Sequence, residues 1–137
     1  MTDSPSPAAS VLHRGLDLML AKDMPGFLAL WHDDATAEFP FAPTGFPRRL
    51  DGIAAITDYL IDYPERLDIA EFSEPTVHQS TDPTVVIAEF TSTGTVVATG
   101  QPYQMPYIAV LTVRDGKIAH YRDYWDPIVA AAVATNV

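Results

Sequence analysis

Cysteine is absent from the sequence, which excludes disulfide bonds, thiol nucleophiles and cysteine-ligated metal centres. Glycine-rich phosphate loops and Gly-x-Ser-x-Gly segments are also missing, so nucleotide binding and acyl-enzyme chemistry have no support in the sequence. We therefore expect a protein without a cofactor. We also expect no metal site, because the histidines show no metal-ligand spacing: His13, His32, His78 and His120.

Basic residues are scarce, with 8 Lys and Arg against 18 Asp and Glu and a formal net charge of -10. Nucleic acids and anionic membranes both require a basic face, so neither is an expected partner. No apolar run approaches the roughly 20 residues that cross a bilayer. The first residues lack the basic and apolar regions of a signal peptide, and we expect a cytoplasmic protein.

A strong hairpin signal stands near the C-terminus, where Asp115-Gly116 separates two β-rich segments, 103–113 and 117–126. Alternation along the second segment predicts that Tyr121, Asp123 and Trp125 share one face. The opposite face would carry His120, Arg122 and Tyr124. A carboxyl group between two large aromatic side chains is the feature that most needs a functional explanation.

The N-terminal part reads as a flexible tail (1–9) followed by three helices. Helical spacing predicts the first from Ser10, as its cap, to Lys22, and a second that begins near Pro25 and carries Phe27, Leu30 and Trp31. The third is expected to be capped by Asp51 and ended by Pro64, with an apolar face of Ile53, Ile56, Tyr59 and Leu60.

The strands are expected mainly after the helices. The exception is a strand over 32–41 that places Ala37, Phe39 and Phe41 on one side and ends irregularly at Pro40, before a loop over 42–50. Further strands are predicted at 67–78, irregular at Pro75, and at 84–97, where Gly94 favours a bulge; a helical turn follows at 128–134. We predict a single α+β domain over 10–137: a cone-shaped α+β barrel, with three N-terminal helices on the concave face of a curled, mostly antiparallel sheet.

This order resembles the nuclear transport factor 2-like superfamily, and within it the SnoaL-like polyketide cyclases and phenazine-biosynthesis A/B proteins. The resemblance covers about residues 10–130 and rests on three segments: His32-Asp-Asp-Ala-Thr, Leu50-Asp-Gly-Ile-Ala-Ala-Ile, and Val113 to Pro127. It implies the cone fold. Function does not follow from it, because this fold carries isomerases, cyclases, hydrolases and non-catalytic proteins.

The ketosteroid isomerase relatives fit poorly at the positions that the resemblance assigns to their catalytic residues. The base position is Phe39, the tyrosine position is near Gly15, and the protonated acid position is near Ile108. None of these residues can replace the group that it would stand for. The Asp-Arg-Asp set of limonene-epoxide hydrolases is also not evident.

For the cyclases and for the phenazine proteins, one of the two catalytic positions is occupied by a suitable residue in this sequence. It is the same residue in both cases. Both resemblances place an acid at Asp123, whereas the histidine partner falls at Ala109 in the first case and at Tyr59 in the second. We therefore select Asp123 and Tyr59 as candidate catalytic residues. The candidate walls of a ligand pocket are aromatic: Trp31, Phe39, Phe41, Tyr103, Tyr107, Tyr121 and Trp125.

Burial among aromatic side chains would raise the pKa of Asp123 and suit it to general acid–base chemistry. We therefore expect a cofactor-free cyclisation, isomerisation or condensation on an aromatic or polyketide-like metabolite. The alternative is a non-catalytic ligand-binding or assembly protein, in which Asp123 pairs with a basic residue such as Arg14 or faces solvent and the aromatic residues only pack. Apolar and β-branched residues on both sides of the strands at 84–93 and 103–112 favour a homodimer through the sheet.

Overall fold

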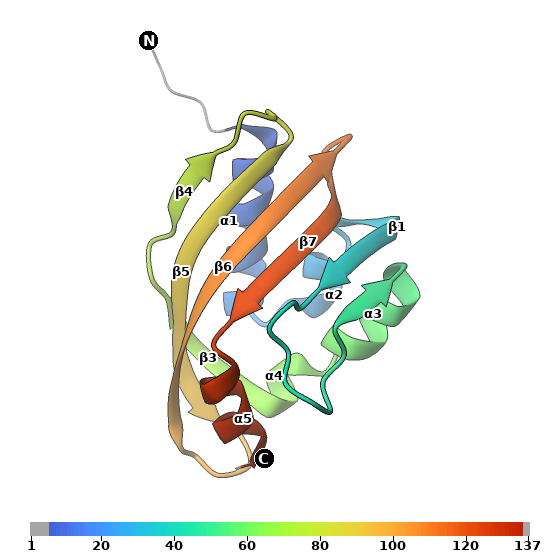
Figure 1. Ribbon diagram of the computed structural model, residues 1–137. Coiled ribbons are helices and arrows are strands. Elements are labelled where there is room, and N and C mark those ends of the chain that lie inside the picture. The colour runs from blue at the N-terminus through green and yellow to red at the C-terminus, as the bar shows by residue number, and fades with distance from the viewer. Residues whose placement is uncertain (1–5, 136–137) are drawn as a thin grey trace.

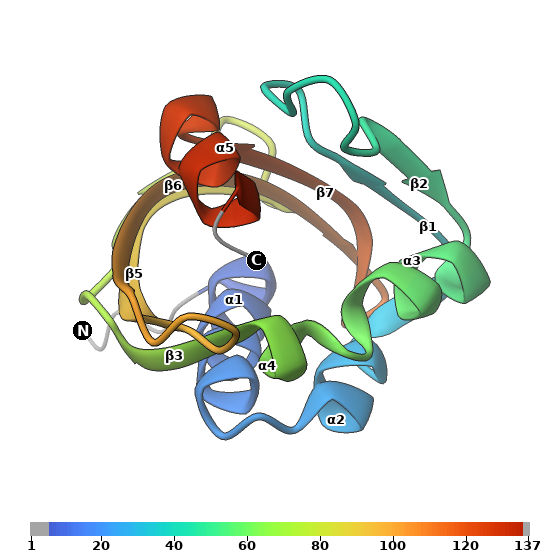
Figure 2. The same cartoon turned by 90° about the horizontal axis from the view of Figure 1, so that it is seen from below.

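The computed structural model describes residues 6–135 and consists of one strongly curled sheet with helices on its concave side (Figures 1 and 2). The helices are α1 (Pro7–Leu20), α2 (Met24–Leu28), α3 (Ile53–Leu60), α4 (Tyr63–Arg66) and α5 (Pro127–Thr135). The strands are β1 (Trp31–Glu38), β2 (Arg49–Asp51), β3 (Leu67–Phe72), β4 (Thr76–Gln79), β5 (Val85–Val96), β6 (Pro102–Arg114) and β7 (Lys117–Trp125).

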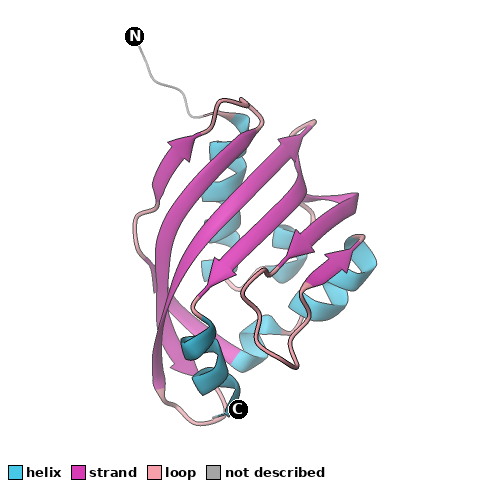
Figure 3. Ribbon diagram, viewed as in Figure 1, coloured by secondary structure: helices cyan, strands magenta, loops and turns pink. Residues whose placement is uncertain are grey.

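The strand order is β2-β1-β7-β6-β5-β3, and β4 pairs with β5 beside β3. All neighbours are antiparallel except β1 and β7, which run parallel. Figure 2 shows that the sheet curls around α1 without closing, and Figure 3 shows α1 and α2 behind the curved layer of strands. The predicted α+β cone with a mostly antiparallel sheet is therefore confirmed.

Helix α1 begins four residues earlier than the sequence predicts. Ser6, not Ser10, is the N-cap, and its hydroxyl accepts a hydrogen bond from the Ala9 amide at 3.2 Å. The first turn is held because Ala8 and Ala9 are buried against the sheet. Assigning 7–9 to a tail was wrong, and residues 1–5 of that predicted tail lie outside the described part of the chain.

Helix α2 is shorter than predicted, and Trp31 belongs to the first strand. The chain leaves the helix at Ala29, and the Leu30 carbonyl accepts a hydrogen bond from the Ile118 amide of β7 at 2.8 Å. This contact draws the backbone into the sheet one residue before Trp31. A single sequence could not show it, because Ile118 lies far along the chain.

The predictions around the third helix also need correction. Asp51 lies in β2 and its carboxylate binds Arg49, so it does not cap α3, whose N-cap position is Gly52 with a φ of 86°. The expected loop over 42–50 thus contains the start of an edge strand. Pro64 does not end α3 but stands in the first turn of α4, where its missing amide costs nothing.

Strand β1 ends at Glu38, but Phe39 still faces inward with Ala37, as predicted. Phe41 does not continue this alternation. The Phe39 amide donates to the Arg48 carbonyl, and the chain then turns outward through Pro40. The segment predicted as one strand over 67–78 forms two strands, β3 and β4, and the predicted turn after Pro127 is a full helix.

Gly94 permits the close approach that curls the sheet, although the bulge lies in the neighbouring strand. The register of β3 against β5 shifts between Ile69 and Glu71, opposite Gly94 and Thr93. A Cβ atom on Gly94 would lie only 2.0 Å from the Asp68 carbonyl oxygen. The Asp115-Gly116 hairpin is confirmed, with φ angles of 53° and 77°.

Candidate functional site

Asp123 lies in the middle of the concave face, because β7 is flanked by β1 and β6. Its neighbour across the ladder is Ala109 on β6, whose small side chain leaves space beside the carboxyl group. Strand β7 has a bulge between Ile118, which pairs with Val113, and His120, which pairs with Thr112. After this bulge the alternation of the strand brings Tyr121 and Asp123 inward.

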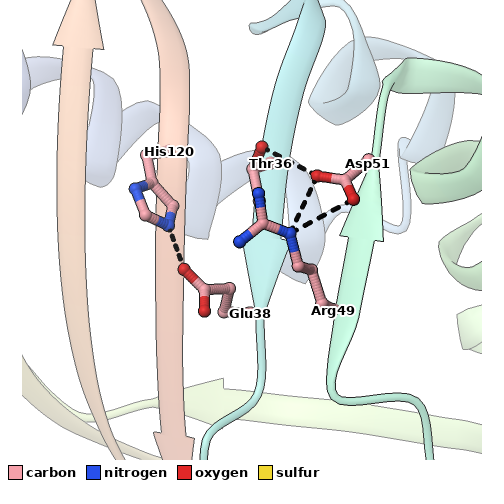
Figure 4. A network of polar contacts seen from close by, with 5 residues as sticks. All are labelled: Thr36, Glu38, Arg49, Asp51 and His120. Carbon is pink, nitrogen blue, oxygen red and sulfur yellow. Dashed lines mark hydrogen bonds and ion pairs between the residues drawn. The ribbon is translucent and has the colours of Figure 1, made fainter.

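The other face of β7 carries polar side chains on the outside of the cone (Figure 4). The His120 ring binds the Glu38 carboxylate at 2.5 Å, and the Asp51 carboxylate accepts hydrogen bonds from Thr36 and Arg49. These groups are separated from Asp123 by the sheet itself. They cannot act on a ligand held inside the cone.

Two cavities meet at Asp123. The smaller has a volume of about 90 Å³ and lies beneath α1, with walls that are almost wholly apolar. The larger, of about 360 Å³, opens toward α3, α4 and α5. Five residues border both cavities: Phe39, Leu60, Tyr63, Tyr107 and Asp123. The larger volume is in the range of small-molecule sites.

One oxygen of the half-buried Asp123 carboxyl group has no hydrogen-bond partner within residues 6–135. Its Oδ1 atom is removed from solvent and accepts no hydrogen bond from the described residues. Burial raises the pKa of Asp123 from 3.8 to about 7, because the charged form loses its hydration and gains no partner. Both the protonated and the ionised form of Asp123 are therefore populated near neutral pH.

Phenolic side chains surround this carboxyl group from three elements. Burial raises the pKa of Tyr63, Tyr107 and Tyr121, and the negative charge of Asp123 adds to each rise. The hydroxyls of Tyr63 and Tyr107 are close enough to share a hydrogen bond. All three phenols therefore remain protonated and can donate hydrogen bonds to a ligand oxygen.

Tyr59 borders the larger cavity together with Asp123, but the described hydrogen bonds include none between them. Its ring packs against Phe39 at 5.4 Å, and the Arg66 guanidinium lies 5.8 Å from the ring centroid on another side. Burial raises the pKa of Tyr59, and the positive charge of Arg66 opposes that rise. Tyr59 therefore lines the cavity without a hydrogen bond to Asp123 among those described.

The aromatic residues chosen from the sequence divide between the two cavities. Trp31 stacks on Tyr121 at 5.6 Å in the wall of the smaller cavity, and Tyr103 and Trp125 border the larger one. Phe41 lines neither of these cavities but borders a separate hollow with Tyr124 and Trp125. It is 56 % exposed and packs on Tyr124 outside the cone, because the chain turns outward after Pro40.

Three residues near the site were missed by sequence reasoning: Tyr63, Phe46 and Ser92. Tyr63 follows Tyr59 at the four-residue spacing of one helix face, a signal hidden by the assumption that Pro64 ends the helix. Ser92 alternates with Phe90 on the inner side of β5, where the pattern alone could have placed it. Phe46 lies in a loop and gives no such signal.

No group of three side chains able to hold a metal ion occurs among the described residues. Within residues 6–135 no helix is both long and apolar enough to cross a membrane. The two cavities, their aromatic walls and the acid between them make the concave side of this α+β cone the candidate small-molecule site.

The chain belongs to the SnoaL-like domain family, whose profile matches residues 12–121. It is 48% identical over 122 residues to the uncharacterised Bacillus subtilis protein YesE, covering 89% of this chain and 83% of that protein. It is also 34% identical over 121 residues to an uncharacterised PhzA/B-like protein of Pseudomonas aeruginosa, covering 88% and 85% of the two chains.

Solved structures agree with this assignment. A Bacillus subtilis protein provisionally described as an isomerase superposes with a TM-score of 0.91 at 44% identity, covering 96% of this chain and 94% of its own. A Pseudomonas putida protein provisionally described as a polyketide cyclase gives a TM-score of 0.78 at 23% identity, covering 94% and 98%. The second likeness concerns the fold alone.

Proposed function

We propose that this protein is a cofactor-free enzyme that uses Asp123 as a general acid–base on a small aromatic or polyketide-like metabolite. The observation that carries the proposal is the buried, unpartnered Oδ1 atom at the junction of two cavities. A carboxyl group in this position destabilises the folded protein. Catalysis would explain why it is kept, because a general base works best when its pKa is near the working pH.

The reaction class that fits is proton transfer at a carbon next to a carbonyl. The Asp123 carboxylate takes the proton, the C–H electron pair moves to the carbonyl oxygen, and an enolate forms. Protonated phenols near the acid, such as Tyr59 and Tyr63, can donate to that oxygen. In an isomerisation the carboxylic acid then returns the proton to the same or another carbon. In a cyclisation the enolate carbon attacks a second carbonyl carbon, the C=O electron pair moves to its oxygen, and the carboxylic acid gives its proton to that oxygen.

Exchange of carbon-bound protons tests the chemistry without knowledge of the natural substrate. We expect the protein to accelerate exchange of the α-protons of 2-tetralone in D₂O at pD 7, as followed by proton NMR. Asp123→Asn should lower the acceleration by roughly 100-fold or more, because general acid–base catalysis contributes about 10²–10⁴-fold.

Asp115→Asn is the matched control, since it makes the same chemical change in the exposed hairpin turn, where asparagine also tolerates a positive φ. It should exchange 2-tetralone at the parental rate. Equal exchange in the parent and in Asp123→Asn would contradict the catalytic assignment.

A non-catalytic ligand-binding protein of the same fold is the second candidate. The observation that favours it is that the position directly opposite Asp123 on β6 is Ala109, which has no titratable side chain. Under this alternative 2-tetralone would bind, as measured by calorimetry, but its protons would not exchange faster than in buffer.

We also propose that two chains associate through the outer faces of their sheets. The support is a row of partly exposed apolar side chains across β5 and β6, including Ile87, Val110 and Ile108, which is 43 % exposed. Sedimentation equilibrium should give a dimer, and Ile108→Lys should shift it toward monomer by placing two like charges in the interface. A monomer in the parent at micromolar concentration would contradict the proposal.

A further inference from the structure

Two hydroxyl groups are buried on neighbouring strands, one on a residue that borders the larger cavity and one beside that residue. Ser92 on β5 is 0% exposed and Tyr103 on β6 is 8% exposed. Both point inward from neighbouring strands. Ser92 pairs with Met105, which borders the larger cavity, and paired residues lie on the same face of the sheet. Tyr103, which pairs with Gly94, is two residues from Met105 and therefore shares that face. Tyr103 borders the cavity itself.

Neither hydroxyl is satisfied by the described residues. Ser92 Oγ and Tyr103 Oη are removed from solvent, and neither makes a hydrogen bond of normal geometry. They are nonetheless neighbours, since the Ser92 hydroxyl acts against the burial that raises the pKa of Tyr103. Leaving a polar group buried and unpaired costs about 1–3 kcal/mol, so such groups in a native protein require an explanation.

Two residues that border the same cavity, Asp123 and Tyr103, therefore each carry a buried polar atom without a hydrogen-bond partner in the described part of the chain, and the other lining residues are mainly apolar or aromatic. We propose that the ligand of this cone carries two oxygen functions on an apolar ring body, one received by Asp123 and the other by Tyr103. Ser92, which lies beside Tyr103 and Tyr107, is then a positioning residue that can form a hydrogen bond with the Tyr103 hydroxyl when the ligand oxygen binds there. The inference rests on the proposed function of the cone.

The second oxygen is a neutral hydroxyl or carbonyl, not a carboxylate. The negative charge of Asp68 acts on Tyr103, and that of Asp123 acts on the neighbouring Tyr107, so this end of the cavity disfavours an anion. Arg66 also borders the cavity, but its guanidinium already binds the Asp62 carboxylate at 3.2 Å and the Tyr59 carbonyl at 3.0 Å.

The test compares two flat two-ring probes that differ in one oxygen, 2-naphthol and 2,6-dihydroxynaphthalene, by calorimetric or fluorescence titration. In the parent we expect the second hydroxyl to tighten binding by roughly three- to tenfold, the worth of one net hydrogen bond. Tyr103→Phe should abolish this gain and leave the affinity for 2-naphthol unchanged within about twofold. Ser92→Ala should reduce the gain, and Tyr124→Phe, on the outer face, should preserve it.

Thermal unfolding of the ligand-free variants gives a second readout. Tyr103→Phe and Ser92→Ala should unfold at or above the parental temperature, because each removes an unpaired buried hydroxyl. The proposal is overturned if the second hydroxyl brings no gain, if the gain survives in Tyr103→Phe, or if neither naphthol binds. Failure of the proposed catalysis is a separate result, since it appears in the exchange of 2-tetralone and not in the difference between these probes.

Discussion

At pH 8 the Asp123→Asn variant is expected to be more stable than the parent, by up to about 4 kcal/mol. Both the folded and the unfolded parent carry an ionised Asp123 at that pH, but only the folded state holds the charge away from water. The free energy follows from the difference between the unfolded pKa of 3.8 and the folded pKa of about 7, because each unit of pKa difference is worth about 1.36 kcal/mol.

The sign of the pH dependence follows from the same two values. Between about pH 4 and pH 7 the folded state holds a proton that the unfolded state has released, so the stability contributed at this position falls as the pH rises. Below pH 4 the carboxyl is neutral in both states and the penalty vanishes. Above pH 7 the penalty is complete and constant.

Urea unfolding at pH 4, 6 and 8 measures the effect as the difference between Asp123→Asn and the parent. The difference should grow with pH, whereas Asp115→Asn should follow the parent throughout. A difference that is the same at pH 4 and pH 8 would show that the folded-state pKa of Asp123 is close to its ordinary value, and it would remove the main support for the catalytic proposal.

The second large effect is expected at Gly94, where alanine should lower the free energy of unfolding by about 3 kcal/mol or more. The added methyl group would meet the Asp68 carbonyl oxygen at 2.0 Å, and a backbone atom cannot move aside as a side-chain tip can. Either β3 shifts away from β5 or the bulge after Ile69 is rearranged. Overpacking of this kind is among the few mechanisms that produce destabilisation of this size.

Denaturant unfolding of Gly94→Ala measures this loss, with Thr95→Ala as the matched control on the next residue of β5. Thr95 is exposed and faces solvent, so its truncation should change the stability by less than about 0.5 kcal/mol. If both variants unfold at the same urea concentration, the close approach of β3 to β5 at Gly94 does not constrain the sheet.

The fold was predictable because its signals are local. The Asp115-Gly116 turn, the alternation on either side of it and the helical spacing of Ile53 and Ile56 each depend on a few neighbouring residues. The errors arose where distant residues decide the structure. Ile118 draws Leu30 and Trp31 into the sheet, and pairing with β1 makes a strand of Arg49–Asp51 within an apparent loop.

The candidate site was predictable only in part, for a similar reason. Alternation places Asp123 and Tyr121 on one face, but it cannot show whether that face is dry, and the pKa of Asp123 depends on that. Phe41 was expected on the face of Phe39 because alternation was extended past Pro40. Tyr63 was missed because a proline in the first turn of α4 was taken as the end of α3.

The parallel pairing of β1 with β7 also fixes an order of events during folding. Trp31 pairs with Ile118 and Ala37 with Tyr121, so the first strand must wait for the last before it takes its place between β7 and the short β2. Contacts of such long sequence separation form slowly, because a large loop must close first. During synthesis we therefore expect the apolar interior to stay open until β7 has left the ribosome. Because Asp123 lies on β7, its carboxyl group enters the interior in the same step that closes the sheet around it.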